Sequence, residues 1–74
     1  MLMLTKVDFS WNENNEFEYQ LKQIAINMDY IISTYDFTTT DPEIKETGIH
    51  TVIICADYNQ YYVQEAINEI WKSE

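Results

Sequence analysis

The single histidine, His50, and the single cysteine, Cys55, are the side chains of this chain best suited to nucleophilic or acid–base chemistry. A Cys–His pair works only when both side chains lie within hydrogen-bond reach of each other. Residues 49–57, IHTVIICAD, have the composition of a strand, and strand positions an odd number apart point to opposite faces. We therefore expect Cys55 to be a buried apolar residue, His50 to lie on the solvent side or at an edge, and no catalytic pair to form.

No other constellation in the sequence is typical of catalysis, of a cofactor or of a metal. A serine triad would depend on the one histidine, and Ser10, Ser33 and Ser73 lack the sequence of a nucleophile elbow. Gly48 is the only glycine, which excludes glycine-rich phosphate-binding loops. The acidic segment DPEIKE lacks the glycine and the spacing of a calcium loop. We expect a non-enzymatic protein with no catalytic residue, no metal and no cofactor.

The charge of the chain points to the class of partner. Thirteen acidic residues and four lysines, without arginine, give a net charge of −9. Such a charge repels nucleic acid and anionic membranes, and it attracts protein surfaces that bind nucleic acid. No apolar run approaches the roughly 18 residues that span a bilayer, and Lys6 and Asp8 interrupt the apolar N-terminal segment. With a lone thiol, these features predict a cytoplasmic protein without a signal peptide.

Two groups of side chains are candidates for binding a protein partner. The carboxylates could be laid out like the phosphates of a nucleic acid, or they could simply keep the protein in solution. The tyrosines near residue 60 could belong to the core or could anchor a partner. The candidate partner-binding residues are Glu13, Glu16, Glu18, Asp36, Asp41, Glu43, Glu46, Tyr58, Tyr61, Tyr62, Glu65 and Glu69.

The rest of the chain divides into segments with clear local patterns. Residues 2–11 alternate between apolar and polar side chains, which predicts a strand with one wet face. Residues 30–39 are rich in β-branched and aromatic types, and residues 49–57 are apolar at both parities, which predicts a second strand and a central third strand. Residues 40–48 hold the only proline and glycine and are expected to be a loop. Residues 59–73 repeat apolar side chains at helical spacing, which predicts a last helix.

The segment 14–28 fits two patterns. Asn and Glu residues suited to a helix N-terminus precede an apolar face at helical spacing, so we expect a helix. The apolar positions of that face are Phe17, Leu21, Ile24, Ala25 and Met28. The alternative is a strand, because Phe17, Tyr19 and Leu21 also alternate, and NENN would then be a hairpin loop to residues 5–11.

Together these segments predict a single α+β domain over residues 1–74 with the order β-α-β-β-α. We expect a right-handed parallel crossover between the first two strands, an antiparallel hairpin between the last two, and a three-stranded mixed sheet of order 1-3-2 with two helices. So small a core needs further stabilisation, so we also expect a homo-oligomer. Its contact would be a sheet edge or a bare face carrying Leu2, Leu4, Val52 or Ile53.

The segments LTKVDF, DYIISTYDF and IHTVIICADY, separated by an acidic helix and a polar loop, resemble small sporulation-associated proteins of Bacillus and their phage relatives. The resemblance covers residues 4–58 as a pattern of short β-α-β-β chains, and the C-terminal helix departs from it. It implies a fold and a phage or low-GC bacterial context, and it implies no site.

The function predicted from size, acidity and lack of motifs is that of a binding protein. Anti-CRISPR and anti-restriction proteins of phages are similar in all three respects. We expect a phage or mobile-element inhibitor, acting in the host cytoplasm, that occludes a host defence or nucleic-acid-handling protein through an acidic surface. Direct nucleic-acid binding is not expected, because the four lysines are scattered. The alternatives are a self-assembling structural or regulatory homo-oligomer and a sponge that binds a small ligand between protomers.

Overall fold

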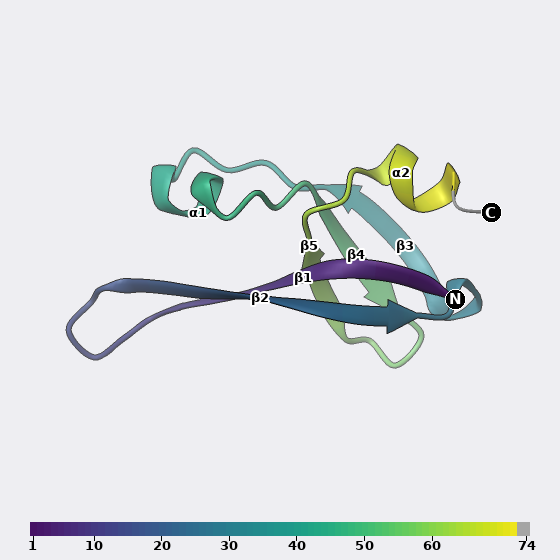
Figure 1. The fold of residues 1–74 in the computed structure, drawn as a ribbon, viewed down its shortest axis with the longest axis horizontal. Helices are drawn as coiled ribbons and strands as arrows, with labels where there is room; N and C mark the ends of the chain where they lie inside the picture. The colour runs from purple at the N-terminus through teal and green to yellow at the C-terminus, as the bar shows by residue number, and fades with distance from the viewer. Residues whose placement is uncertain (73–74) are drawn as a thin grey trace.

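The computed structural model describes residues 1–72, which form one five-stranded antiparallel sheet with two short helices (Figure 1). The elements are β1 (Leu2–Trp11), β2 (Phe17–Ile26), the 3-10 turn η1 (Met28–Tyr30), β3 (Ile31–Asp36), α1 (Pro42–Glu46), β4 (Thr51–Cys55), β5 (Gln60–Val63) and α2 (Ile67–Lys72). The sheet order is β2-β1-β5-β4-β3, and all neighbouring strands run antiparallel. The predicted three-stranded mixed sheet of order 1-3-2 is therefore wrong, although β3 and β4 do pair antiparallel as expected.

The largest correction concerns the helix predicted over 14–28, where the structure has β2. The ten residues of β2 pair with β1 along their whole length, from Trp11↔Phe17 at the turn to Leu2↔Ile26 at the far end. This ladder satisfies the backbone groups of both strands and gathers the apolar side chains of β2 on the faces they share with β1. The strand that the sequence left open as an alternative is the one that forms.

Both hairpin turns are closed by the same backbone pattern. In the β1–β2 turn, Asn15 N–H donates to the Asn12 carbonyl at 2.9 Å, with Asn15 at a left-handed φ of 61°. In the β4–β5 turn, Tyr58 occupies the position equivalent to Asn15. Its N–H donates to the Cys55 carbonyl at 2.8 Å, and its φ is 66°. Asparagine adopts this conformation readily, whereas tyrosine does so at a cost. Asn59 O accepts from Cys55 N–H at 3.0 Å and completes the second turn.

The predicted last helix over 59–73 is wrong in its first half. Residues Gln60–Val63 form β5, which lies in the middle of the sheet between β1 and β4. Only Ile67–Lys72 are helical, as α2, and residues 73–74 lie outside the described part of the chain. Two tyrosines and a valine are strong strand formers, and pairing on both sides fixes this short segment as a strand.

The segment 40–48, predicted as a loop, contains the short helix α1. Asp41 is its N-cap, because the carboxylate oxygen Oδ1 accepts from the backbone N–H of Glu43 at 2.9 Å and of Ile44 at 3.4 Å. The proline at the first helical position supplies a compatible φ and lacks an N–H that would go unpaired there. Gly48, at φ 80°, follows the helix in the left-handed conformation that ends many helices.

One face of the sheet, called the core face below, carries the buried apolar cluster. The cluster consists of Leu2, Leu4, Ile26, Ile53, Cys55, Val63 and, from α2, Ile70. Helix α2 is held there by the fully buried Ile70, and Trp71 Nε1 donates to Thr34 Oγ1 at 3.1 Å. The predicted burial of Cys55 is confirmed, whereas Leu2, Leu4 and Ile53 are core residues and not parts of a bare face.

Glu65 fixes the path of the chain between β5 and α2. Its carboxylate accepts from the backbone N–H of Thr5 at 2.9 Å and from Thr5 Oγ1 at 3.1 Å. Its backbone carbonyl accepts from the buried Thr51 Oγ1 at 2.7 Å. These bonds tie the segment after β5 to β1 and β4, so α2 starts from a fixed position over the core face.

Candidate functional site

The second face of the sheet, called the open face, carries a continuous set of aromatic and aliphatic side chains. Lys6 pairs with Val63, a residue of the core face, so Val7 and Tyr62 point to the opposite face. The same register argument assigns to the open face Val7, Phe9, Trp11, Phe17, Tyr19, Leu21, Tyr35, Phe37, Val52, Ile54 and Tyr62. All of them except Val7 are half-buried or exposed. Extended apolar surfaces are typical of interaction sites, which makes the open face the candidate functional site.

Six rings on the open face form a connected chain, called the aromatic ladder. Its members are Trp11, Phe17, Tyr19, Phe9, Tyr62 and Phe37. At the hairpin end the ring centroids of Trp11 and Phe17 lie 5.2 Å apart, and Phe9 lies 5.6 Å from Tyr62 on β5. Tyr62 in turn lies 5.6 Å from Phe37, just after β3. These mostly edge-on contacts fix the rings in place while leaving their outer surfaces free for a partner.

The outer part of the aromatic ladder is the most accessible. Trp11 is 45% exposed and Tyr19 44%, and both lie near the turn of the β1–β2 hairpin, which projects beyond the other strands (Figure 1). Val7, further along β1 on the same face, is only 1% exposed. The open face therefore changes from a packed centre to an accessible aromatic arm.

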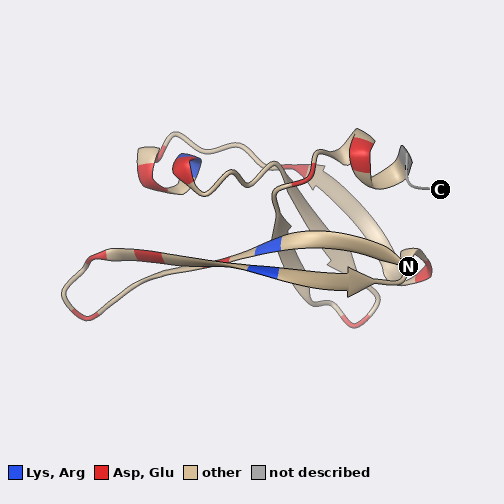
Figure 2. Cartoon of the chain, viewed as in Figure 1, with Lys and Arg blue, Asp and Glu red and all other residues tan. Residues whose placement is uncertain are grey.

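Six of the predicted acidic residues gather at one end of the molecule, called the acidic end. They are Glu13, Glu16 and Glu18 at the tip of the β1–β2 hairpin and Asp41, Glu43 and Glu46 on α1. Figure 2 shows both groups toward the same end of the longest axis, where the accessible part of the aromatic ladder also lies. Two of these carboxylates have internal roles, because Glu18 accepts from Asn12 Nδ2 at 3.1 Å and Asp41 caps α1.

The remaining predicted acids do not join this group. Asp36 is exposed at the end of β3, and Glu69 lies on α2, which packs on the core face. The carboxylate of Glu65 accepts hydrogen bonds from the backbone N–H and the hydroxyl of Thr5. The twelve candidate residues therefore do not form one surface, and the acidic end is the part of the set that the fold brings together.

The three candidate tyrosines lie in three different places. Tyr62 belongs to the aromatic ladder on the open face. Tyr61 points to the core face, where Lys6 Nζ lies 5.5 Å from its ring centroid. Tyr58 is 83% exposed in the β4–β5 turn. Tyr62 alone among them could contact a partner together with the acidic end.

The sequence reasoning missed the residues that dominate the open face. Trp11, Phe17 and Tyr19 were not candidates: Trp11 was part of the predicted strand 2–11, and the other two lie in the segment 14–28 that was predicted to be a helix. The signal that could have identified them is the alternation of aromatic residues on both sides of NENN. Such a pattern is typical of a hairpin whose directly opposed rings contact each other across the strands.

The groups best suited to catalysis are kept apart. His50 is exposed, with Nδ1 2.8 Å from the Gly48 carbonyl oxygen, whereas Cys55 is buried on the core face. Burial and the negative charge of Asp57 raise the pKa of the Cys55 thiol, which makes it a weaker nucleophile at neutral pH. Within residues 1–72, no three His, Cys, Asp or Glu side chains converge in a way that could hold a metal ion.

Comparisons with known proteins identify no relative. No family model, no curated protein and no solved structure matches the chain. Within the described residues, no helix combines the length and the apolar character that crossing a bilayer requires.

Proposed function

We propose that this protein is a non-enzymatic inhibitor that binds a nucleic-acid-handling protein, such as a host defence enzyme, and occludes its nucleic-acid surface. In its most specific form the proposal describes a protein of a phage or mobile element. The open face with its aromatic ladder supplies the contact area, and the acidic end supplies the charge. The observation that carries the proposal is the accessible aromatic arm beside the exposed carboxylates.

The composition of the open face supports a protein partner. Aromatic residues are enriched in the buried centres of protein interfaces, where Trp and Tyr contribute a large share of the binding energy. The aromatic ladder is held rigid by its ring contacts, so ordering these side chains on binding costs little entropy. Trp11 and Tyr19, at the accessible end, are the expected anchors.

The charge supports a basic partner over a second copy of this chain. Two copies with a net charge of −9 each repel one another, most strongly if they approach through their acidic ends. A nucleic-acid-binding surface carries lysines and arginines that complement Glu13, Glu16, Glu43 and Glu46. Electrostatic complementarity of this kind accelerates association and suppresses wrong partners.

The experiment that tests the proposal is affinity capture from a low-GC bacterial lysate with matched baits. The wild type is compared with Trp11→Ser, and Tyr58→Ser serves as a control, since it removes an exposed ring from a different turn. The proposal expects a nucleic-acid-binding protein that both the wild type and the control retain, that Trp11→Ser loses, and that added DNA or salt releases. Retained proteins that do not bind nucleic acid, or that remain bound when DNA is added, would exclude the proposed target class.

The alternative of self-assembly rests on the same open face, which a second copy could also cover. Sedimentation equilibrium of the purified chain distinguishes the two. A mass of one chain at micromolar concentration excludes a stable homo-oligomer, and with it a ligand sponge that forms between protomers. A mass of two or more chains that falls to one chain in Trp11→Ser would favour self-assembly through the open face.

A further inference from the structure

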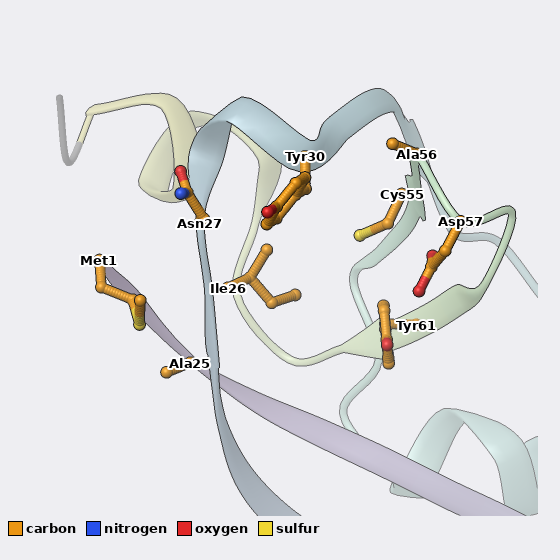
Figure 3. A pocket seen from close by; sticks show the side chains of 9 residues that line it. All are labelled: Met1, Ala25, Ile26, Asn27, Tyr30, Cys55, Ala56, Asp57 and Tyr61. Atoms are coloured by element: carbon orange, nitrogen blue, oxygen red, sulfur yellow. The ribbon is translucent and has the colours of Figure 1, made fainter.

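A pocket lies away from the open face, at the end of the core face near η1 and the β4–β5 turn. It has a volume of about 540 Å³, within the range of about 300–1,000 Å³ that small-molecule sites occupy. Its walls come from Met1, which precedes β1, from the ends of β2 and β4, from η1, from the β4–β5 turn and from β5. Figure 3 shows the lining side chains around the open space.

The interior of this pocket is apolar and aromatic. Ile26 and Cys55 of the core face form its inner wall, and the rings of Tyr30 and Tyr61 stand at its sides (Figure 3). The backbone holds two of these walls together, because Ala56 N–H donates to the Tyr30 carbonyl at 2.7 Å. Tyr30 is 61% exposed, so a bound molecule would cover a ring that is now in water. These features favour a ligand with a compact apolar or aromatic body.

The polar groups of the pocket favour a positive charge on that ligand. Asp57 is the charged side chain of the lining, and Figure 3 shows its carboxylate directed toward the space beside Tyr61. Its position is fixed, since Oδ1 accepts from Asn59 N–H at 3.1 Å and Oδ2 accepts from Asn59 Nδ2 at 2.8 Å. Each oxygen keeps a lone pair for a further donor. Carboxylates and tyrosine ring faces both attract ammonium groups, and Met1, whose α-ammonium is the other charged group of the lining, lies across the pocket from Asp57 (Figure 3).

The influence of Asp57 inside the pocket is visible at a second group. The Asp57 charge contributes to the raised pKa of the Cys55 thiol, which lies on the inner wall. The same field that disfavours a thiolate there favours a bound cation and opposes a bound anion. A net charge of −9 adds to this preference at longer range.

We propose that the pocket between Ile26, Tyr30, Cys55, Asp57 and Tyr61 binds a small organic cation, namely a protonated primary amine carried on an aromatic body. The ring of the ligand packs on Ile26 and Cys55 between the two tyrosines, and its ammonium group donates to the Asp57 carboxylate. This site is independent of the open face, so the failure of one proposal leaves the other standing.

The test uses three indole probes of similar size and different charge, namely tryptamine, 3-methylindole and indole-3-acetate. Titrations of the ¹⁵N-labelled protein are followed by amide chemical shifts. The expected result is saturable shifts for tryptamine at residues 26, 30 and 55–57, about tenfold weaker binding of 3-methylindole, and still weaker binding of indole-3-acetate. Equal affinity for the three probes, or shifts confined to the aromatic ladder, would overturn the proposal.

A matched pair of variants isolates the role of Asp57. Asp57→Asn keeps the side-chain oxygen that accepts from Asn59 N–H, so the turn is preserved while the charge is removed. Asp29→Asn removes an exposed charge from η1, outside the pocket lining. Tryptamine should bind Asp57→Asn about tenfold more weakly and Asp29→Asn as it binds the wild type. Equal losses in the two variants would attribute the preference to net charge and contradict a site at Asp57.

Discussion

Trp11 and Phe17 face each other across the end of the β1–β2 hairpin, with ring centroids 5.2 Å apart and ring planes inclined by 60°. They are the last residue of β1 and the first residue of β2, so their contact closes the hairpin next to the NENN turn. Both rings belong to the aromatic ladder, in which Trp11 is 45% exposed and Phe17 is half-buried. The Trp11–Phe17 contact thus both closes the hairpin and forms part of the proposed binding surface.

Trp11→Ser separates these two roles. Removing the ring deletes the cross-strand pair, and such pairs contribute about 0.5 to 1.5 kcal/mol, so we expect a loss of that size in the free energy of unfolding, measured by urea denaturation. Partner binding should fall by at least about 2 kcal/mol, the level of a buried aromatic anchor, measured by calorimetry with the captured protein. A loss of binding no larger than the loss of stability would contradict the anchoring role.

The acidic end can be tested through association kinetics. Replacing Glu13, Glu16, Glu43 and Glu46 with glutamine removes four exposed carboxylates, whereas Asp41 is left in place because its loss would also uncap α1. We expect the association rate constant to fall and its salt dependence to flatten, with the dissociation rate nearly unchanged. Surface plasmon resonance at two ionic strengths measures both. A changed dissociation rate with an unchanged association rate would show that these acids do not steer the encounter.

The strands β1, β3 and β4 could be predicted from the sequence because each shows its pattern locally. The alternation of residues 2–11, the β-branched run of 30–39 and the apolar run of 49–57 each overlap a strand of the structure. The segment 14–28 could not be decided in this way, since its apolar residues fit periods of both 2 and 3.6. The pairing with β1 decides it, and this pairing extends from Trp11↔Phe17 beside the turn to Leu2↔Ile26 at the far end, so the pattern within 14–28 alone does not show it.

The candidate site shows the same limit. The acidic residues could be named from charge alone, and the fold gathers six of the nine candidate acids at one end and disperses the other three. The aromatic ladder could not be assembled from the sequence, because it depends on β5 lying next to β1 so that Tyr62 meets Phe9. The four-residue β5 is too short to show a period of its own, and its place in the sheet comes from pairing on both sides.

The bonds between Glu65 and Thr5 predict a measurable structural role for one of the acids. Glu65→Ala leaves the Thr5 backbone N–H without its acceptor, which should cost about 1 to 3 kcal/mol in the free energy of unfolding. Hydrogen exchange at the Thr5 amide should accelerate accordingly. Glu13→Ala, which removes the same charge from an exposed turn, should change neither quantity. Equal effects of the two variants would point to net charge and not to the Thr5 bonds.

The attachment of α2 depends on Ile70, which is fully buried against the core face. Ile70→Ala should lower the free energy of unfolding by about 2 to 5 kcal/mol, because it removes buried methyl groups and leaves a cavity. The matched control is Ile32→Ala, at a position of β3 that is 57% exposed, where we expect a loss below about 1 kcal/mol. Urea denaturation of both variants gives the comparison. Similar losses would mean that α2 contributes little to the core.

The raised pKa of the Cys55 thiol predicts how its reactivity and the stability of the fold depend on pH. Burial is the larger cause of the raised pKa and the Asp57 charge the smaller. The rate of iodoacetamide alkylation should therefore rise at a higher pH in the folded protein than in the urea-unfolded chain. Asp57→Asn should move the alkylation profile of the folded protein part of the way to lower pH, and Asp29→Asn should not move it.

Because the folded state holds the thiol proton of Cys55 more tightly than the unfolded state does, the stabilising contribution is present below the unfolded pKa of the thiol. It is lost as pH rises toward the folded pKa. Cys55→Ala should therefore lose less stability than the wild type over that alkaline range, and parallel losses would show that the thiol does not titrate differently in the fold.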